Sequence, residues 1–225
     1  MLDWMNSLPP NHVDMSQPRA LIFDCDGTLA DTMPAHYQAW VATLKPQGAT
    51  FTEDQFYGMG GWPTQSVAEW MVREHRMTVT ADDITREKEA RFEQMLHTIE
   101  PVEAVTTIAR QEYGRRPMAV ATGGMRRICE AILRHLGCLD WFDTIVCCED
   151  VSRHKPAPDI FLEAARRLNI PPAECLVYED TNPGIQAAQA AGMAVIDVRG
   201  MGSSSKWKMT STGQAINVNG GWHMS

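Results

Sequence analysis

The stretch Ala20-Leu21-Ile22-Phe23-Asp24-Cys25-Asp26-Gly27-Thr28 decides the fold of this chain. Its first four residues are apolar and predict a short buried strand. Asp24 and Asp26 follow where that strand ends, and Gly27 indicates a sharp turn that can bring both carboxylates to the same side of the loop. A reactive site at the carboxyl end of a strand is the favoured interpretation. An acidic turn that only solvates charge is the alternative.

Composition limits the functions that this chain can have. A length of 225 residues suffices for one large domain, or for a core with an insert, without disulfides or a structural metal. The formal net charge is −8 and no run of Lys and Arg occurs, so nucleic acid and anionic membranes are disfavoured partners. We expect a small phosphorylated molecule to need a local cationic pocket.

Cysteine usage and hydropathy indicate a cytoplasmic protein. The six cysteines are scattered without a C-x-x-C pair, which supports neither a zinc site nor a redox motif. Reduced thiols in the cytosol fit this pattern best. The first 18 residues lack a positive region followed by an apolar stretch, and no apolar run is long enough to span a membrane.

Five short runs predict strands, at residues 20–23, 118–122, 144–147, 175–178 and 194–198. Segments with helical periodicity alternate with them, which is typical of a parallel sheet covered by helices on both faces. We therefore predict a doubly wound α/β fold. Ligands of such sheets bind at the carboxyl ends of the strands, where Asp24, Thr122 and Asp180 fall.

The segment between the first two predicted strands is too long for one crossover helix. Its clearest helical runs are residues 34–45, 63–75 and 81–99. We predict a helical cap domain at residues 33–100, inserted into a core domain of residues 1–32 and 101–199. Residues 200–225 are rich in Gly, Ser, Thr and Asn, and we expect a flexible tail without catalytic residues.

Four motifs in this order resemble those of the haloacid dehalogenase (HAD) superfamily: Asp24-x-Asp26-Gly27-Thr28, Thr122, Lys155-Pro156-Ala157-Pro158-Asp159, and Glu179-Asp180. The resemblance implies a Rossmann-like core. The helical insert between the first two motifs is similar to that of the β-phosphoglucomutase-like subgroup. Two further stretches resemble bacterial fructose-1-phosphate/6-phosphogluconate phosphatases, namely Arg116-Pro117-Met118-Ala119-Val120 and Gly184-Ile185-Gln186-Ala187-Ala188.

This resemblance implies different catalytic roles for the two aspartates. Asp24 would attack phosphorus to give an aspartyl phosphate. Asp26 would protonate the departing alkoxide and then deprotonate the hydrolytic water. A lysine in Lys-Pro-x-Pro-Asp would supply positive charge, although Lys155 read alone could be an ordinary exposed lysine.

Cations are needed because a phosphate close to several carboxylates is repelled by about 4 kcal/mol per charge pair at 4 Å. The resemblance implies Mg²⁺ bound by Asp24, the backbone carbonyl of Asp26, and Asp180. Glu179 would ligate the metal through water or orient Asp180.

The resemblance also implies a phosphate-binding turn after the second strand. The hydroxyl of Thr122 and the backbone N–H groups of Gly123 and Gly124 would hold phosphoryl oxygens. Thr122 could instead cap the helix that begins near Met125.

Two residues of the predicted cap are weaker candidates for substrate binding. Lys88 lies on the apolar stripe of Ile84 and Phe92, which is unusual for a lysine. It matches a substrate-contacting lysine of the subgroup, while snorkelling along the cap core is the alternative. His36 matches a histidine near the hinge, and a packed or capping histidine is the alternative.

Phosphatase activity is favoured over phosphosugar mutase activity. Mutases of the subgroup hold the second phosphate with a cap arginine, and Thr64 occupies the matching position here. We therefore expect Mg²⁺-dependent hydrolysis of a sugar phosphate of the fructose 1-phosphate or 6-phosphogluconate type, by a monomer. A β-phosphoglucomutase-type mutase is the alternative, and a non-catalytic phosphosugar-binding protein is a remote one.

Overall fold

The computed structural model describes residues 18–199 and 201, and the backbone of residues 207–209 and 215–217. A five-stranded parallel sheet forms its centre, in the order β3-β2-β1-β4-β5. The strands are β1 (Ala20–Phe23), β2 (Met118–Ala121), β3 (Thr144–Val146), β4 (Cys175–Glu179) and β5 (Ala194–Asp197). Each lies within one residue of its predicted bounds, and the predicted doubly wound α/β fold is confirmed.

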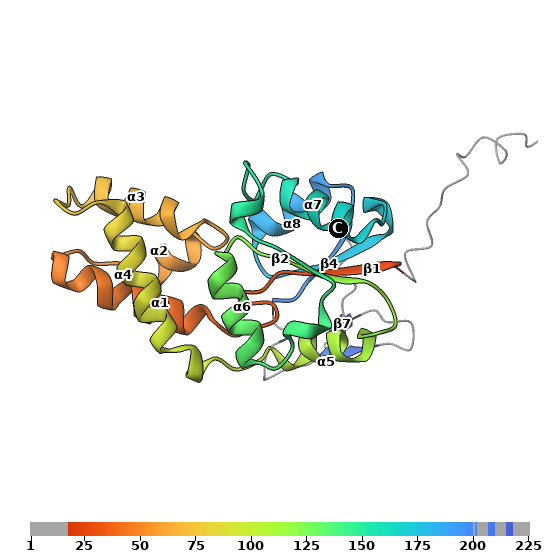
Figure 1. Ribbon diagram of the computed structural model, residues 1–225. Helices are drawn as coiled ribbons and strands as arrows, with labels where there is room; N and C mark the ends of the chain where they lie inside the picture. Colours follow the sequence, from red (N-terminus) through yellow and green to blue (C-terminus); the bar gives the residue numbers. More distant parts are fainter. Residues whose placement is uncertain (1–17, 200, 202–206, 210–214, 218–225) are drawn as a thin grey trace, which may run out of the picture.

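Both faces of the sheet are buried, which explains its apolar strands. Leu21 and Phe23 of β1 belong to the cluster that packs against α5 (Glu103–Glu112) and α6 (Arg126–His135). Ala20 and Ile22 belong to the opposite cluster, with α7 (Asp159–Leu168) and α8 (Asn182–Ala190). Figure 1 shows α7 and α8 above the sheet and α5 and α6 below it. Because side chains of β1 alternate between the two faces of the sheet, each face presents apolar residues against which one layer of helices packs.

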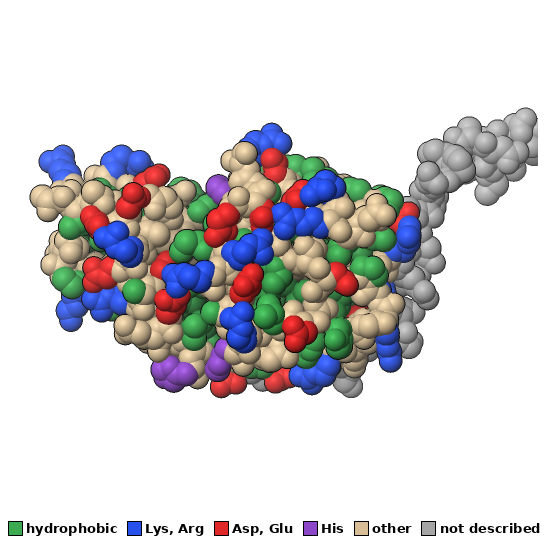
Figure 2. Space-filling view, in the orientation of Figure 1, with side chains coloured by type: hydrophobic (Ala, Val, Ile, Leu, Met, Phe, Trp, Pro, Cys, Tyr) green, Lys and Arg blue, Asp and Glu red, His purple; other side chains and the backbone are tan. Residues whose placement is uncertain are grey.

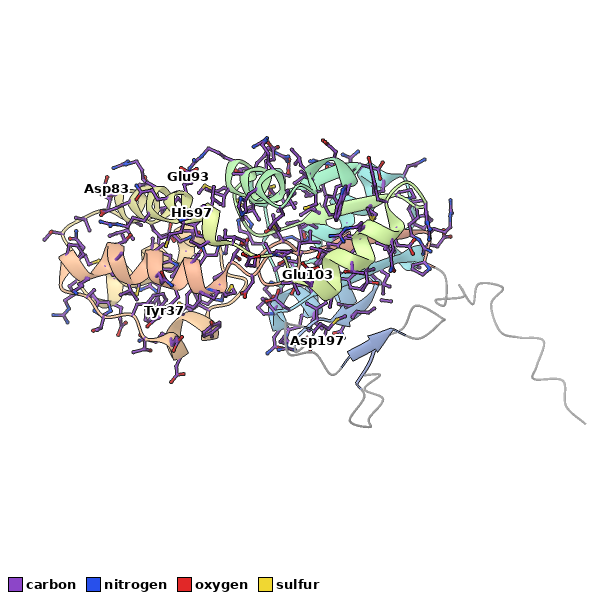
Figure 3. All side chains as sticks on the ribbon, turned by 90° about the horizontal axis from the view of Figure 1, so that it is seen from below. Tyr37, Asp83, Glu93, His97, Glu103 and Asp197 are labelled. Atoms are coloured by element: carbon purple, nitrogen blue, oxygen red, sulfur yellow. The ribbon has the colours of Figure 1, made fainter. Side chains whose placement is uncertain are left out.

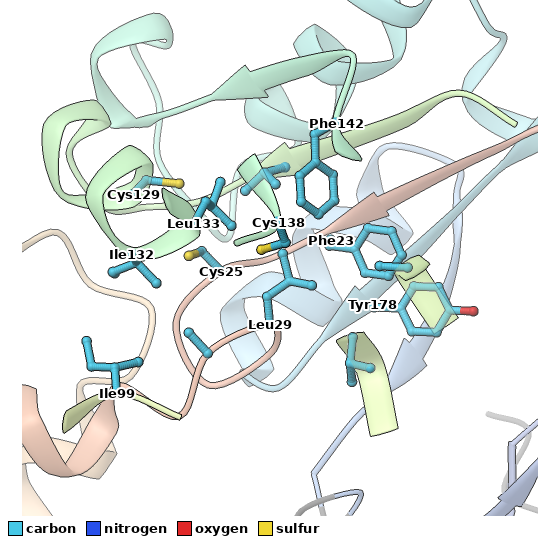
Figure 4. Packing of buried hydrophobic residues seen from close by; sticks show 14 of the residues in the cluster. Phe23, Cys25, Leu29, Ile99, Cys129, Ile132, Leu133, Cys138, Phe142 and Tyr178 are labelled. Carbon is cyan, nitrogen blue, oxygen red and sulfur yellow. The ribbon is translucent and has the colours of Figure 1, made fainter. Parts of the chain in front are cut away.

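Aromatic and thiol side chains support the loop that follows β1 (Figure 4). The ring of Phe23 stacks on Tyr178 at 4.8 Å between centroids and meets Phe142 edge-on at 5.9 Å. Cys25 and Leu29, from the loop itself, are fully buried in the same cluster. The loop is therefore anchored in the core by Cys25, which lies between the two aspartates, and by Leu29.

Residues 33–99, here called the helical insert, form a second packing unit between β1 and β2 (Figure 1). Its helices are α1 (Met33–Leu44), α2 (Glu53–Gly58), α3 (Thr64–Glu74) and α4 (Ala81–Gln94). They enclose their own apolar cluster, which includes Trp40, Phe56 and Met71.

Two elements of the insert differ from the prediction. α2 was not predicted, although Thr52 and Gln55 form a capping box at its start. The helix predicted over residues 81–99 is too long: α4 ends at Gln94, and a 3₁₀ turn at Leu96–Thr98 leads Ile99 into the core cluster of the sheet. Further 3₁₀ turns lie at Lys45–Gln47, Leu139–Trp141, Cys148–Asp150 and Pro172–Glu174.

The two chain segments that join the insert to the sheet run side by side. Ala30 forms a β-bridge with Pro101, and the backbone N–H of Asp31 donates to the carbonyl of Glu100 at 2.9 Å. Glu93, near the end of α4, lies where the insert meets the rest of the protein (Figure 3) and forms an ion pair with Arg127 of α6. These contacts fix the position of the insert over the carboxyl end of the sheet.

The chain termini fall largely outside the described residues. Of the predicted tail, the structure describes an antiparallel pair of strands, β6 (Trp207–Met209) and β7 (Ala215–Asn217), and residue 201. Residues 1–17 and the other tail residues lie outside the description. In the described part of the chain, every helix is too short or too polar to span a lipid bilayer. Basic and acidic side chains are interspersed on the face shown in Figure 2.

Candidate active site

The loop after β1 is held against the end of β4. Gly27 has a φ of +80°, a conformation that glycine adopts without strain. A Cβ at this position would overlap the carboxylate of Asp180, which follows β4. Thr28 donates from its hydroxyl to Asp180 Oδ1 at 3.0 Å. Glycine at position 27 therefore serves both the turn and the close approach of Asp180.

Lys155 bridges two buried carboxylates. Its Nζ lies 2.7 Å from Asp24 Oδ1 and 2.7 Å from Glu179 Oε1. Burial alone would lower the pKa of Lys155, but the charges of Asp24 and Glu179 raise it above its ordinary value. Lys155 is thus a buried ammonium held beside the strand ends, and the alternative of an exposed lysine is wrong.

Carboxylates outnumber ammonium groups at this edge of the sheet. Burial raises the pKa of Asp24 well above its usual range, against the opposing charge of Lys155, and the neighbouring carboxylates raise it further. Burial and the charge of Glu179 raise the pKa of Asp180 to about 7. Burial is the largest cause of both shifts and the neighbouring carboxylates add to it, so a bound cation at this edge would favour the charged forms of Asp24 and Asp180.

The residues present fit a magnesium ion. Oxygen ligands suit this hard cation, and the predicted set consists of two carboxylates, Asp24 and Asp180, and the backbone carbonyl of Asp26. Such a set has only two ligating side chains. Within the described residues, no three His, Cys, Asp or Glu side chains form a metal-binding group.

Glu179 is engaged elsewhere through both carboxylate oxygens. Oε1 accepts from Lys155, and Oε2 accepts from the backbone N–H and the hydroxyl of Thr181, at 2.5 and 3.0 Å. A Cβ at Gly184, in the first turn of α8, would overlap this carboxylate. The contacts favour a role for Glu179 in positioning Lys155 rather than in binding metal directly.

Asp26 is tied to the helical insert through one oxygen. Oδ1 accepts from the Thr32 hydroxyl at 2.8 Å and lies 3.1 Å from His36 Nε2. On the other side of that ring, Lys88 Nζ lies 2.8 Å from Nδ1. Because an ammonium can only donate, we assign the ring proton to Nε2, which donates to Asp26.

The pKa values agree with this assignment. Burial, followed by the charge of Lys88, lowers the pKa of His36, which keeps the ring neutral. Burial alone would raise the pKa of Asp26, but the hydrogen bonds from His36 and Thr32 and the charge of Lys88 lower it, to about 2. The second oxygen, Oδ2, lies beside Gly124 and has no hydrogen-bond partner in the described part of the chain.

Lys88 is buried inside the insert, so the snorkelling alternative is wrong. The residue is 1% exposed, and its Nζ donates to Glu89 Oε1 at 2.9 Å as well as contacting His36. The ammonium also lies 5.2 Å from the ring centroid of Phe92, on which His36 stacks at 3.8 Å. Lys88 and His36 therefore meet in one chain of hydrogen bonds that ends at Asp26.

The turn after β2 completes the site. The hydroxyl of Thr122 accepts from the backbone N–H of Gly124 at 3.0 Å. Helix α6 begins at Arg126 with Met125 as its N-cap residue, and the carboxylate of Glu149 accepts from the backbone N–H of Arg126 at 3.0 Å. The alternative in which Thr122 caps this helix is therefore wrong.

One pocket between the sheet and the insert collects most of the predicted site residues. Asp180 is not among its lining residues, and its carboxylate lies against Gly27. Apolar residues of the insert, including Trp40, Phe56 and Trp62, form the remaining wall. The predicted residues that line the pocket are Asp24, Asp26, His36, Lys88, Thr122, Gly123, Gly124, Lys155 and Glu179.

Two polar residues of this site were missed in the sequence. Thr32, the N-cap residue of α1, bonds to Asp26 rather than to the helix. Glu89 lies in a charged run, where a solvated position is usual, yet it is 3% exposed. Its place three residues before Phe92, on the same side of the predicted helix, is the signal that could have indicated an inward-facing position.

Comparison with known proteins identifies the family. The family model for haloacid dehalogenase-like hydrolases matches residues 21–198, which is most of the chain. The chain belongs to the haloacid dehalogenase-like hydrolases. This match confirms the predicted superfamily. The predicted enzyme class, a phosphatase, is also confirmed.

Individual members of the HAD family show the range of relatives. The chain is 42% identical over 180 residues to the fructose-1-phosphate phosphatase YqaB of Escherichia coli, covering 80% of this chain and 95% of that protein. It is 28% identical to the β-phosphoglucomutase of Bacillus subtilis, covering 80% and 83%. The crystal structure of CbbY from Rhodobacter sphaeroides in complex with phosphate superposes with a TM-score of 0.74 at 26% identity, covering 80% and 86%.

Proposed function

We propose that this HAD-family enzyme is a Mg²⁺-dependent phosphatase that hydrolyses a small sugar phosphate of the fructose 1-phosphate or 6-phosphogluconate type. The observation that carries the proposal is the separation of Asp24 and Asp26 into two environments. Asp24 is held by Lys155 at the strand ends, while Asp26 is held by His36 and keeps one oxygen without a partner in the described structure. The 42% identity to a fructose-1-phosphate phosphatase supports the substrate class.

In the proposed reaction, an Asp24 oxygen forms a bond to phosphorus as the bond to the sugar oxygen breaks. Asp26 gives the sugar oxygen its proton, and then takes a proton from the water that attacks phosphorus. That second attack releases inorganic phosphate and restores the Asp24 carboxylate. The pKa of Asp26 in the free site is about 2. The negative charge of a phosphate bound beside Asp26 would raise this pKa.

The surrounding residues would hold the phosphoryl group. When bound, Mg²⁺ supplies positive charge that offsets the crowding of carboxylates and phosphate. Asp24, Asp180 and the backbone carbonyl of Asp26 would bind it. Lys155 would balance charge on the opposite side, and the Thr122 hydroxyl with the N–H groups of Gly123 and Gly124 would receive phosphoryl oxygens.

Hydrolysis is favoured over mutase chemistry by the residue at position 64. Thr64 donates to the carboxylate of Glu89 at 2.8 Å, so the position matched to the mutase arginine carries no positive charge. We propose that residues 33–100 form a cap domain that delivers Lys88 and His36 to a core of residues 1–32 and 101–199. The separate apolar cluster of the helical insert supports this division.

We also propose that the enzyme is a cytoplasmic monomer. In the described part of the chain, exposed large apolar residues such as Tyr57, Tyr113 and Leu162 are spread over different elements rather than gathered in one patch. The six cysteines are free thiols, which fits a reducing compartment.

Release of inorganic phosphate from a panel of hexose and pentose phosphates, with Mg²⁺ present, tests the proposed function. Conversion of β-glucose 1-phosphate in the presence of its bisphosphate serves as the mutase control. The proposal predicts phosphate release from a sugar monophosphate and no isomerised sugar phosphate. Isomerisation faster than phosphate release would establish the mutase alternative instead.

A further inference from the structure

Glu89 places a buried carboxylate at the insert end of the pocket. The residue is 3% exposed, and its Oε1 accepts from the Thr64 hydroxyl at 2.8 Å and from Lys88 Nζ at 2.9 Å. Its other oxygen, Oε2, is buried and has no hydrogen-bond partner among the described residues. A buried acceptor without a donor is unfavourable, and a donor from a bound molecule would relieve it.

Charge at this end of the pocket is balanced without a ligand. Lys88 is the ammonium that the insert contributes to the pocket, and Glu89 pairs with it. His36, which also contacts Lys88, is neutral in the assigned state. The remaining ammonium of the pocket, Lys155, is paired with Asp24 and Glu179 at the sheet. A second anionic group of a substrate would therefore meet the Glu89 carboxylate, and every ammonium that lines the described pocket is already paired.

We propose that Glu89 is a specificity-determining residue that selects phosphate monoesters whose remaining part is uncharged and carries hydroxyl groups. Glu89 Oε2 accepts a hydrogen bond from a hydroxyl of the substrate, and the carboxylate repels a second phosphate or a carboxylate. This inference rests on the proposed phosphatase function. Of the two proposed substrate types, it selects the fructose 1-phosphate type over 6-phosphogluconate, which carries a carboxylate.

The apolar wall beside Glu89 fits the same kind of substrate. Trp40, Phe56 and Val67 line the pocket and belong to the cluster of the insert. These side chains offer surface for the carbon skeleton of a sugar and no partner for a second charge. A neutral sugar thus matches the wall, and its hydroxyls match the free oxygen of Glu89.

The Glu89→Gln variant tests the inference through a ratio of substrates. The amide that replaces the carboxylate would no longer neutralise Lys88, so the ammonium would be free to attract an anionic group. We expect the ratio of kcat/KM for fructose 1-phosphate over 6-phosphogluconate to exceed about 10 in the parent and to fall by roughly tenfold or more in the variant. The change should come largely from KM. The kcat/KM for fructose 1,6-bisphosphate should change in the same direction as that for 6-phosphogluconate.

Glu87→Gln is the matched control, because Glu87 lies on the same helix but pairs with Arg91 and has a 42% exposed side chain. It should leave the ratio unchanged. An unchanged ratio in Glu89→Gln would overturn the inference. A parent enzyme with a higher kcat/KM for 6-phosphogluconate than for fructose 1-phosphate would also overturn it, and this measurement does not depend on the folding of a variant. Phenyl phosphate, assayed alongside, distinguishes failure of the inference from failure of the proposed function. If the parent released phosphate from none of these esters, the proposed function would fail and the inference with it.

Discussion

His36 of α1 lies 3.1 Å through Nε2 from Asp26 Oδ1, so a residue of the helical insert holds the proposed acid–base residue of the core. The same ring receives Lys88 of α4 on its opposite nitrogen at 2.8 Å. The hydrogen bond from His36 to Asp26 therefore depends on the placement of both helices, in addition to the bond that Thr32 donates to the same oxygen. This relationship links the position of the insert to the protonation chemistry at the strand ends.

Replacing His36 by Ala should slow catalysis more than it weakens substrate binding. The Asp26 carboxylate would lose the hydrogen bond that orients it and helps to lower its pKa. We expect kcat to fall by about tenfold or more, with a smaller change in KM. Steady-state kinetics of phosphate release measure both. His97→Ala, which removes an exposed histidine of the same insert, should match the parent. Equal kcat values for the two variants would contradict the role of His36.

Gly184→Ala should disturb the site through Glu179. The added Cβ would overlap the Glu179 carboxylate, which holds Lys155. We expect the free energy of unfolding to fall by about 1–3 kcal/mol, together with activity. Thermal or urea unfolding measures the first. Gly58→Ala is the control, because nothing lies within 4 Å of a Cβ at Gly58. A Gly184→Ala variant as stable and active as Gly58→Ala would show that the contact is not needed.

Magnesium should stabilise the protein through Asp180. At a concentration about 100 times its Kd, Mg²⁺ should raise the Tm by about 5 °C or more. Asp180→Asn should lose this increase, since an amide binds the cation more weakly than a carboxylate does. Asp197→Asn, which changes an exposed aspartate paired with Arg199, should keep it. An undiminished Tm increase in Asp180→Asn would remove Asp180 from the ligand set.

Asp150 should contribute to stability in a pH-dependent way. Burial would raise its pKa, but hydrogen bonds from the Cys147 backbone and Arg167 and the charges of Arg126 and Arg167 lower it. A carboxylate whose pKa is lowered by folding stabilises the protein above its unfolded pKa of about 3.9, and the benefit is lost as the pH falls through the folded value.

Asp150→Asn should therefore lower the free energy of unfolding by about 1 kcal/mol at pH 7. The difference from the parent should shrink below about pH 4 as Asp150 itself becomes protonated. Urea unfolding across pH measures it, and Asp140→Asn, at an exposed position, should show no difference at pH 7. A deficit that stayed constant down to pH 2 would mean that charge is not its source.

The strands could be predicted from the sequence because burial on both faces leaves a plain signal. β1 consists of four apolar residues followed at once by carboxylates, so its end is defined by composition alone. Helix ends in the insert were harder to predict. The chain leaves α4 at Gln94 because Ile99 packs into the core of the sheet, a tertiary contact that the helical period does not encode.

The candidate site was predictable where residues follow strands and less so where helices supply them. Asp24, Thr122 and Asp180 follow strand ends, so the parallel sheet brings them to one edge. Glu89 was missed because a charged residue beside Lys88 in a charged run usually faces solvent. The packing of α4 against α1 and α3 buries it.

If Asp24 is the nucleophile of a sugar-phosphate phosphatase, its replacement by Asn should nearly abolish phosphate release. With fructose 1-phosphate and saturating Mg²⁺, Asp24→Asn should be folded and its kcat should be lower than the parent value by about a thousandfold or more. An Asp24→Asn enzyme that released phosphate as fast as the parent would show that Asp24 is not the nucleophile.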